Sequence, residues 1–487
     1  MSASAVVVLA FLAPLAGAPL IWLSSANPNR REAVSLITAG VLFALVASLV
    51  PEVIDGGRPG AVLVEIFPGL ALAFKVEPLG LLFALVASTL WIATTLYSIG
   101  YMRGNNEQHQ TRYYVYFALS LAATIGIAFA ANLVTLFVFY EALTLSTYPL
   151  VTHKGTDEAR AGGRTYLAIL LFTSIAFLLL AVILTWTTAG TLDFTPGGIL
   201  AGKASPTMTT ILLGLYAFGI GKAALMPFHR WLPAAMVAPT PVSALLHAVA
   251  VVKAGVFSVL KVVIYVFGVE RLAELGSSRW LMYVAAATIL IASLVALRCD
   301  NLKARLAYST VSQLSYIVLG AMLANTLGII GGAMHIAMHA FGKITLFFCA
   351  GAIYVATHKT EVSELRGLGR TMPLTMGAFL VGSLSVIGLP PLGGLWSKWY
   401  LALGTLDAGA YGLLAVLMVS SLLNIAYLLP IPVRAFFSRP DEPDVAVGIN
   451  EAPWPCVAAL VFSALGCVAL FFFSGPIYRL LSALAPT

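Results

Sequence analysis

One acidic residue and four lysines lie in the interior of long apolar segments, where a chain rarely keeps charge. Of the 20 acidic residues, only Glu141 falls in the middle of such a segment. The lysines in comparable positions are Lys222, Lys253, Lys343 and Lys398. An ionised group at the centre of a membrane costs roughly 2.5 to 3.5 kcal/mol on insertion scales. A chain that keeps several such groups is expected to move charge, and the pattern is typical of a proton path.

The acid and the first lysine could act together as a switch. Glu141 lies on the segment LVTLFVFYEALTLSTYPLV, where Thr144, Leu145 and Tyr148 share its face at helical spacing. Burial favours the neutral form of a carboxyl group or an amine, and a nearby opposite charge restores ionisation. If Lys222 meets Glu141, opening and closing of the pair would release and recapture a proton. A static ion pair that joins two helices is the alternative, but it leaves the other lysines unexplained.

Two histidines extend the series of titratable groups. His335, His339 and Lys343 stand at positions i, i+4 and i+8 of MHIAMHAFGK, so they share one face of a helix. Histidine titrates near pH 6.5 and can pass protons at ordinary pH, which favours a relay. A His-x-x-x-His pair can also bind a metal, but no carboxylate or cysteine accompanies it on this segment. Ordinary buried, hydrogen-bonded histidines are the other alternative.

Three further groups lie apart from this face. His229 follows Lys222 by seven residues, but a proline intervenes and a shared face cannot be assumed. His247 and Lys253 are six residues apart, a turn of about 600° in a regular helix, which puts them on different faces. Both histidines are therefore accessory candidates. Lys261 lies near the end of its segment, and its side chain is expected to reach the lipid headgroups.

The elements that must position these residues are membrane helices. The 487 residues are 60% hydrophobic and 10% charged, with a mean hydropathy of +0.95. Apolar stretches of about 20 residues recur along the chain, which predicts an all-α polytopic membrane protein with about fourteen crossing segments. The first stretch, residues 4–23, lacks a basic leader and a small-residue cleavage site, so we expect a retained helix.

The distribution of positive charge predicts the topology. Most of the 27 lysines and arginines fall in every second connection between apolar segments. By the positive-inside rule, both termini are expected on the outer side of the cell inner (plasma) membrane. The net charge of +7 reflects this topology, and no clustered basic face indicates nucleic-acid binding. The four cysteines lack paired spacing, which favours packing over disulfides or a zinc site.

Two of the apolar segments are interrupted. Prolines and glycines break GIGKAALMPFHRWLPAAMVAPTP at 219–241 and SVIGLPPLGGLWSK at 385–398. In lipid such a break survives only where protein or water satisfies the freed backbone groups. Interrupted helices in matching positions of two halves indicate an inverted repeat with its working groups near the midplane. Simple proline kinks are the alternative, but each break lies within a few residues of Lys222 or Lys398.

Several motifs, in order along the chain, resemble one known family. The stretches are FYEALTLSTYPLV, GKAALMPFHRWLPAAMVAPTPVSALLHAVAVVKAGVF, NLKARLAYSTVSQLSYI, MHIAMHAFGKITLFFCAG and GLPPLGGLWSKWY. They resemble the antiporter-like subunits shared by Mrp-type sodium/proton antiporters, respiratory complex I and membrane-bound hydrogenases, over about residues 75–430. The resemblance implies fourteen helices with two inverted five-helix repeats, each with a broken helix. The implied divisions are helices 1–3 at 1–111, the repeats at 112–267 and 279–436, and a C-terminal helix with its tail at 453–487.

The resemblance also implies residue roles. Glu141 corresponds to the acid of the fifth segment and Lys222 to its partner in the seventh. Lys253 corresponds to the relay of the eighth segment and Lys398 to the terminal base of the twelfth. The central bridge corresponds to His335, His339 and Lys343.

Within the family, FYEALTLSTYPLVTHKGT and DFTPGGILAG are most similar to the bacterial D-type subunit of Mrp antiporters. Lys398 stands where the M-type subunit of complex I usually has a glutamate. The resemblance implies a proton-translocating subunit of a multisubunit sodium/proton antiporter, with other membrane subunits as partners. The alternative is a proton-pumping subunit of a complex I-like NADH:quinone oxidoreductase or a membrane-bound hydrogenase. An inert scaffold, or the membrane half of an ion or bicarbonate uptake system, is a third class.

The sequence contains no recognisable redox-cofactor motif, nucleotide-binding loop or catalytic triad. We therefore expect no cofactor, and a transporter subunit more than an enzyme. Transport would be driven by an ion gradient or by a partner, and in the complex I-like alternative the chain would be part of a redox-driven pump.

Overall fold

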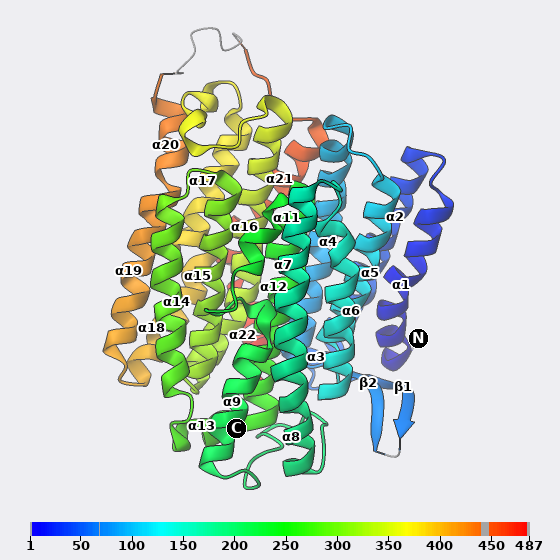
Figure 1. Ribbon diagram of the computed structural model, residues 1–487, viewed down its shortest axis with the longest axis vertical. Helices are drawn as coiled ribbons and strands as arrows, with labels where there is room; N and C mark the ends of the chain where they lie inside the picture. The colour runs from blue at the N-terminus through cyan, green and yellow to red at the C-terminus, as the bar shows by residue number, and fades with distance from the viewer. Residues whose placement is uncertain (1, 68, 440–447, 485–487) are drawn as a thin grey trace.

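Nearly all of the chain folds into long helices that run side by side (Figure 1). The computed structural model describes residues 2–67, 69–439 and 448–484. In this part, ten helical spans are long and apolar enough to cross a membrane: Ala3–Leu23, Pro28–Ile54, Pro78–Gly104, Leu133–Val151, Asp157–Ala189, Thr240–Phe267, Arg279–Arg298, Thr326–Thr357, Tyr411–Phe437 and Trp454–Phe472. The predicted polytopic helical membrane protein is thereby confirmed, and its first apolar stretch is a helix. A total of fourteen crossings is reached only if shorter, broken or more polar helices between these spans also cross the membrane. The number fourteen therefore stays a prediction.

The first part of the chain forms a group of helices and one hairpin. Its helices are α1 (Ala3–Leu23), α2 (Pro28–Ser48), α3 (Val50–Ile54), α4 (Pro78–Gly104), α5 (Gln110–Ala128), α6 (Leu133–Val151), α7 (Asp157–Thr173), the π-helical η1 (Ser174–Leu179) and α8 (Leu180–Ala189). Strands β1 (Gly60–Phe67) and β2 (Leu70–Lys75) pair antiparallel in the connection before α4. Apolar periodicity alone indicates only a connection between membrane segments here. We call the end of the bundle that carries the two strands the hairpin end.

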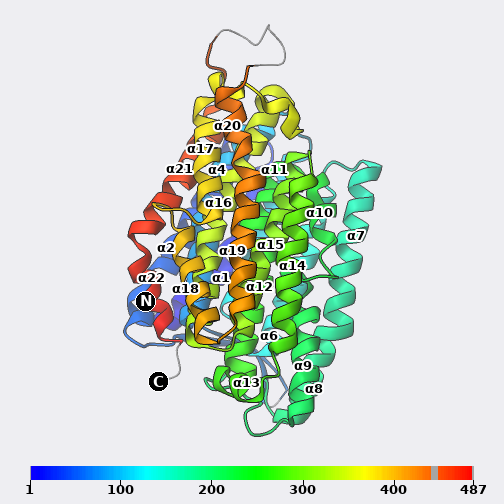
Figure 2. The same cartoon turned by 90° about the vertical axis from the view of Figure 1, so that its left-hand side faces the viewer.

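The middle of the chain contains the first interrupted helix and the two most buried helices. The elements are α9 (Pro206–Gly219), η2 (Gly221–Ala223), α10 (Trp231–Ala234), η3 (Ala235–Val237), α11 (Thr240–Ala244), η4 (Leu245–Val249), α12 (Val251–Val262), η5 (Val263–Phe267), α13 (Val269–Leu275), α14 (Arg279–Arg298), α15 (Leu302–Met322) and α16 (Thr326–Thr357). The apolar stretch of the span Thr240–Phe267 is 100% buried and that of α16 is 94% buried. Together α12 and α16 form the centre of the molecule (Figure 2).

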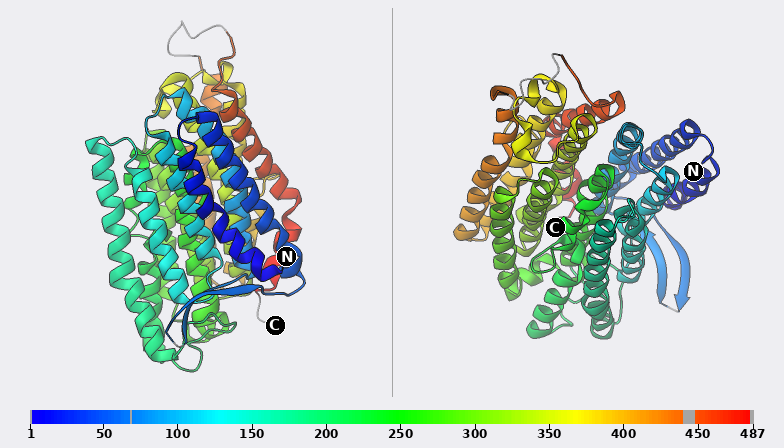
Figure 3. Two further views of the ribbon diagram at one scale, coloured as in Figure 1. Left: turned by 90° about the vertical axis from the view of Figure 1, so that its right-hand side faces the viewer. Right: turned by 45° about the horizontal axis from the view of Figure 1, so that its top comes forward.

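The last part of the chain packs against helices from its first part. It consists of η6 (Val362–Leu365), η7 (Leu368–Arg370), α17 (Pro373–Ile387), α18 (Gly394–Asp407), α19 (Tyr411–Leu428), α20 (Pro430–Phe437), α21 (Trp454–Phe472) and α22 (Ser474–Ser482). Helix α21 packs against α4 and α16, so the last long helix lies beside the first helices of the chain (Figure 3). There the Cys456 thiol approaches the Tyr97 carbonyl oxygen at 3.5 Å.

Both predicted interruptions are confirmed, and protein groups satisfy the freed carbonyls. After α9 the chain passes through η2 and a left-handed Ala224 (φ 53°), and the Trp231 indole donates to the Gly221 carbonyl oxygen at 2.9 Å. After α17 the chain turns at Gly388 (φ 93°), and the Lys398 ammonium donates to the Ile387 carbonyl oxygen at 3.0 Å. Such internal partners are what a broken helix needs at membrane depth.

The second break depends on a glycine without a side chain. A Cβ atom added at Gly394 would overlap the backbone carbonyl oxygen of Ser385. We therefore expect Gly394→Ala to lower the free energy of unfolding by about 1–3 kcal/mol, because the backbones would have to move apart. Thermal unfolding in detergent would measure this. Gly377→Ala on α17 is the control, because a Cβ there meets nothing within 4 Å. Equal unfolding temperatures for the two variants would contradict the expectation.

Candidate functional site

Lys222 lies on the interrupted helix and is held by α6. Its ammonium donates to the Tyr140 carbonyl oxygen at 2.8 Å and to the Thr144 hydroxyl at 2.6 Å. It also lies 3.2 Å from the centre of the Tyr140 ring. The short turn η2 can approach α12 because Gly255 has no side chain, and a Cβ atom there would overlap the Lys222 backbone. The lysine is completely buried, and its first contacts are a carbonyl, a hydroxyl and an aromatic face.

Glu141 lies on the same helix as these contacts, but it does not form an ion pair with Lys222. Among the residues that the structure describes, both carboxylate oxygens of Glu141 are buried and neither has a hydrogen-bond partner. The ion pairs formed in this part of the chain do not include Glu141 with Lys222. The predicted pairing of Glu141 with Lys222 is therefore not formed in this structure. The predicted common face of α6 divides, since Thr144 is buried while Leu145 is 57% exposed.

The central groups make direct contacts between α12 and α16. The Lys253 ammonium lies 2.6 Å from Nδ1 of His339. The rings of His339 and His335 are stacked with their centres 5.5 Å apart. His335 continues to α18, where its Nδ1 lies 2.8 Å from the Ser397 hydroxyl, and its Nε2 lies 3.1 Å from the side-chain oxygen of Gln313. All five side chains are buried, so they form a continuous polar series inside an apolar bundle.

Lys343 is on the same helix as the two histidines and points to a second polar group. Its ammonium donates to the Ser309 hydroxyl at 2.5 Å and to the Leu306 carbonyl oxygen at 3.3 Å. The Tyr427 hydroxyl donates to the side-chain oxygen of Asn424 and lies 2.9 Å from the Ser309 hydroxyl. In the structure, Lys343 therefore forms a branch toward α15 and α19, next to the direct series through the histidines.

Lys398 lies at the second interruption and reaches back across it. A Cβ atom at Gly388 would lie 2.8 Å from the Cδ atom of Lys398, so the glycine leaves room for the side chain. The ammonium lies 3.3 Å from the Ser421 hydroxyl and 4.9 Å from the centre of the Tyr316 ring. Tyr316 in turn stacks on His335 with ring centres 5.7 Å apart. One aromatic ring thus separates the lysine at the break from the histidine pair.

The two accessory histidines lie outside the hydrogen-bonded series. Neither ring nitrogen of His247 has a partner among the described residues, and the ring packs on Phe347 of α16 at 4.6 Å. Because the π-helical turn η4 precedes α12, His247 and Lys253 both contact α16. The prediction that they face different directions, made from regular helix geometry, was wrong. His229 lies 6.2 Å from the ring of Tyr308.

Lys261 does not reach the lipid headgroups, so that expectation was wrong. Its side chain is 1% exposed and forms an ion pair with Glu77 at 3.1 Å, where the Glu77 side chain is 4% exposed. The ammonium also donates to the Ala130 carbonyl oxygen at 2.7 Å. Lys261 lies two helical turns beyond Lys253 on α12, toward its π-helical continuation and the hairpin end.

Sequence reasoning missed the neutral polar residues that join the charged ones. Tyr140 and Ser309 each lie in an apolar segment and contact a lysine, and Asn424 joins Ser309 through Tyr427. Ser397 and Gln313 flank His335. The available signal was the presence of hydroxyl and amide groups in segments otherwise built of aliphatic residues, since buried polar groups in lipid need partners.

The sequence is similar to that of known membrane proteins. Residues 130–424 match the family described as "NADH:quinone oxidoreductase/Mrp antiporter, TM". NADH-quinone oxidoreductase subunit N of Desulforudis audaxviator is 34% identical over 423 residues, which cover 84% of this chain and 83% of that protein. The A-type subunit of the Na(+)/H(+) antiporter of Alkalihalophilus pseudofirmus is 30% identical over 441 residues, which cover 83% of this chain and 53% of that protein.

Several relatives are longer than the region that matches. The match covers 50% of the chloroplastic NAD(P)H-quinone oxidoreductase subunit 5 of Adiantum capillus-veneris, so the chain spans about half the length of such relatives. Two solved structures share the fold over almost the whole chain. A chain of the Mrp complex from Dietzia sp. DQ12-45-1b matches 99% of this chain with a TM-score of 0.86 at 24% identity. A chain of the archaeal membrane-bound sulfane sulfur reductase matches 98% with a TM-score of 0.83 at 24% identity.

Proposed function

Because the chain belongs to the NADH:quinone oxidoreductase/Mrp antiporter family of membrane proteins, we propose that it is a proton-translocating, antiporter-like subunit of a multisubunit complex. The observation that carries the proposal is the buried series in which Lys253 meets His339 at 2.6 Å and His339 stacks on His335. Groups that can exchange protons lie here within contact distance, at the centre of a membrane bundle.

In the proposed path, Glu141 and Lys222 form the switch at the first interruption. Lys253 and the histidine pair carry the proton across the centre, and Lys398 exchanges it at the second interruption. Lys343 supplies a side branch that holds charge beside the path, while His229 and His247 are accessory. A proton on Lys222 is released when the Tyr140 and Thr144 contacts are its only support, and it is retained when Glu141 closes on it.

We propose further that the complex is a sodium/proton antiporter of the Mrp type, with this chain in the position of the D-type subunit. The motifs quoted above, the identity with an A-type antiporter subunit and the shared fold of a Mrp-complex chain support this assignment. The partners would be the other membrane subunits, and the ions H⁺ and Na⁺. A sodium ion needs several oxygen ligands, which backbone carbonyls at the breaks or a neighbouring subunit would have to supply.

A complex I-like or hydrogenase-like assembly is the second candidate. It is favoured by the match to NADH-quinone oxidoreductase subunit N, which covers 83% of that protein, whereas the match covers 53% of the A-type antiporter subunit. The fold of a chain in an archaeal respiratory membrane complex is also shared. In this candidate the same path would be driven by electron transfer in partner subunits.

The internal repeat and the membrane orientation complete the proposal. Residues 112–267 and 279–436 would form two inverted five-helix repeats, supported by the placement of one break and one lysine in each. Helix α20 and the turns before α17, which carry Arg366, Arg370 and Arg434, lie at the end opposite the hairpin (Figure 1). Because positive residues favour the cytoplasmic side, both termini would lie outside the cell inner (plasma) membrane.

Transport assays in vesicles separate the two candidate complexes. Everted membrane vesicles are prepared from host cells with and without the gene, and an acid-sensing dye reports the proton gradient. For the antiporter, added NaCl should collapse a preformed gradient only when the gene is present. For the respiratory assembly, the gene should instead be needed to form a gradient on addition of an electron donor. If the gene changes neither response, proton translocation is contradicted.

The histidine pair can be tested directly. Replacing both His335 and His339 with leucine should slow transport by roughly a hundredfold and shift its pH dependence, because the centre of the path loses two groups that can bind and release a proton. Rates measured across pH in vesicles with equal amounts of assembled complex give both values. His358→Asn is the control, because this histidine is exposed after α16 and asparagine tolerates its left-handed backbone (φ 57°). A double variant with the unchanged rate and pH profile would mean that the pair serves packing.

A further inference from the structure

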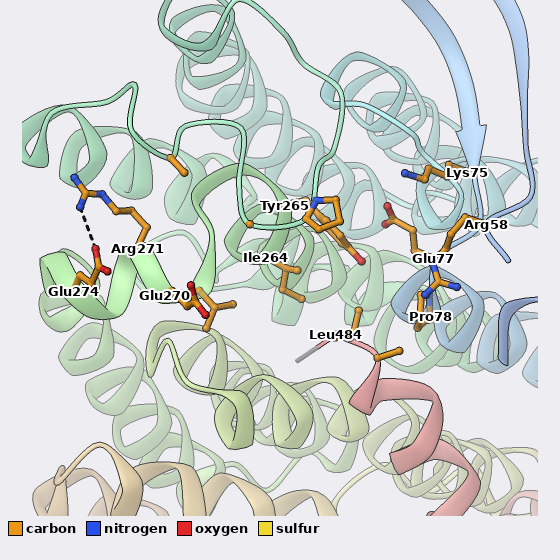
Figure 4. Close-up of a pocket in the computed structure, with 15 residues that line it drawn as sticks. Arg58, Lys75, Glu77, Pro78, Ile264, Tyr265, Glu270, Arg271, Glu274 and Leu484 are labelled. Carbon is orange, nitrogen blue, oxygen red and sulfur yellow. Dashed lines mark hydrogen bonds and ion pairs between the residues drawn. The ribbon is translucent and has the colours of Figure 1, made fainter. Parts of the chain in front are cut away.

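A buried ion pair outside the described path lies at the edge of a cavity. At the hairpin end, a pocket of about 450 Å³ is bordered by Glu77, Lys75 and Arg58 on one side and by Tyr265 and α13 on the other (Figure 4). Glu77 is the lining residue that forms the ion pair with Lys261. Lys261 itself is covered by aromatic rings, with the centres of Phe194, Phe257 and Tyr265 at 4.7, 5.6 and 5.8 Å from its ammonium.

The Glu77 carboxylate does not cap the helix that follows it. Glu77 is the residue before α4, where an acidic side chain often accepts a hydrogen bond from the first backbone N–H groups of the helix. No such bond is formed, and the side chain turns instead to Lys261. The Ala130 carbonyl oxygen is the second acceptor for the ammonium, and it comes from the connection between α5 and α6. Three separate segments are therefore arranged around one lysine.

A purely structural ion pair would not need a cavity beside it. A buried pair often contributes little net stability, so its presence alone does not explain why it is kept. Here one partner borders a polar pocket, and the other is on the helix that carries Lys253. The two lysines are eight residues apart, about 12 Å along the axis, a distance that a short chain of ordered waters can span.

We propose that Glu77 and Lys261 form a proton-exchange site that connects the pocket at the hairpin end with the buried path on α12. The inference rests on the proposed proton translocation and adds to it a third exchange position, besides the two broken helices. As the ion pair opens, Glu77 takes up a proton from the pocket and Lys261 passes its own proton toward Lys253. Glu77 then gives its proton to the neutral Lys261, which restores the carboxylate and the ammonium as the pair closes. The other charged groups at the pocket are Arg58, Lys75, Glu270, Arg271 and Glu274.

Transport by charge-matched variants tests this site. Lys261→Arg keeps a positive charge near Glu77 but cannot release a proton, so transport by the intact complex should slow by about tenfold or more. Glu77→Gln should slow it similarly. The double variant Glu77→Gln with Lys261→Gln leaves no unpaired charge and should also be slow. Lys203→Arg is the matched control, because this lysine likewise donates to a backbone carbonyl, that of Ala189 at 2.8 Å. Asp157→Asn controls for loss of an exposed acid.

A labelling experiment reports the site independently of transport. A water-soluble carbodiimide that does not cross membranes is added to vesicles of either orientation, and modified carboxyl groups are found by mass spectrometry. Glu77 should be modified only from the face that carries the hairpin, and faster as the pH falls. Absence of modification from both faces, or full transport by assembled Lys261→Arg, would overturn the inference. If Glu141→Ala also leaves transport unchanged, it is the proposed function that fails, and labelling of Glu77 still decides whether the pocket reaches the pair.

Discussion

Glu141→Ala and Lys222→Ala are each expected to reduce proton-coupled transport by at least about a hundredfold while the complex still assembles. Lys222 is completely buried, and its ammonium is bonded to Tyr140 and Thr144 of the helix that carries Glu141. Removing the lysine removes the proton carrier. Removing Glu141 takes away the negative charge that favours protonation of Lys222. After releasing one proton, Lys222 would then stay neutral and transport would stop.

Graded variants make the test of this switch sharper. Glu141→Asp should retain part of the activity, because the acid survives with a shorter reach. Thr144→Val should destabilise the arrangement in which Lys222 is bonded to α6, because it removes one of the two hydrogen-bond acceptors of the ammonium. Glu158→Ala on α7 is the control, since this acid is exposed at the start of its helix. Dye-quench rates in vesicles with matched expression measure all of these variants. Near-normal transport in either alanine variant at position 141 or 222 contradicts the switch.

Lys398→Arg is expected to preserve assembly and to lose most transport. The lysine stands at the second break with its ammonium on the Ile387 carbonyl oxygen, where a proton must be both bound and released. Arginine keeps its proton throughout the pH range of such an assay, whereas a lysine side chain can both bind and release one. A Cβ atom at Gly388 would lie 2.8 Å from the lysine Cδ, so this glycine is what admits the present side chain.

Two further substitutions separate titration from fixed charge at this position. Lys398→Glu introduces another titratable group and should retain more transport than Lys398→Ala. Lys359→Arg, on an exposed connection, controls for the substitution itself. All variants are compared in one vesicle assay with the amount of assembled complex determined. Full activity of Lys398→Arg would show that position 398 supplies only a permanent positive charge.

The sequence predicted the features that depend on local composition. Long apolar runs predict membrane helices because lipid leaves the backbone few alternatives, and the prolines near Lys222 and Lys398 predict both interruptions. The shared face of His335 and His339 follows from their spacing of four residues. These features need no knowledge of which helices are neighbours.

The sequence could not predict features that depend on packing between distant segments. The contact of Lys253 with His339 joins residues 86 positions apart, and periodicity does not select that partner. The π-helical turn before Lys253 changed which way His247 faces, because a single extra residue in a turn rotates what precedes it. The buried pair of Lys261 with Glu77 was missed for a similar reason. The position of Lys261 near the end of its apolar segment suggested contact with lipid. In the structure, three aromatic rings and the Glu77 side chain cover this lysine.

The length of α16 determines where the path can be interrupted. Its 32 residues span about 48 Å, well beyond the hydrocarbon layer of about 30 Å, and His335, His339 and Lys343 all lie on this one continuous rod. Tilting or sliding the rod leaves the spacing of these three groups unchanged. What can open are the joints with other elements, and on the path these are the contacts with Lys253 on α12 and with Ser397 on α18. Further contacts join His335 and Lys343 to α15. The middle of the path is thus mechanically fixed, and a displacement of about one ångström at either joint would lengthen its hydrogen bond beyond the normal range without unfolding any helix.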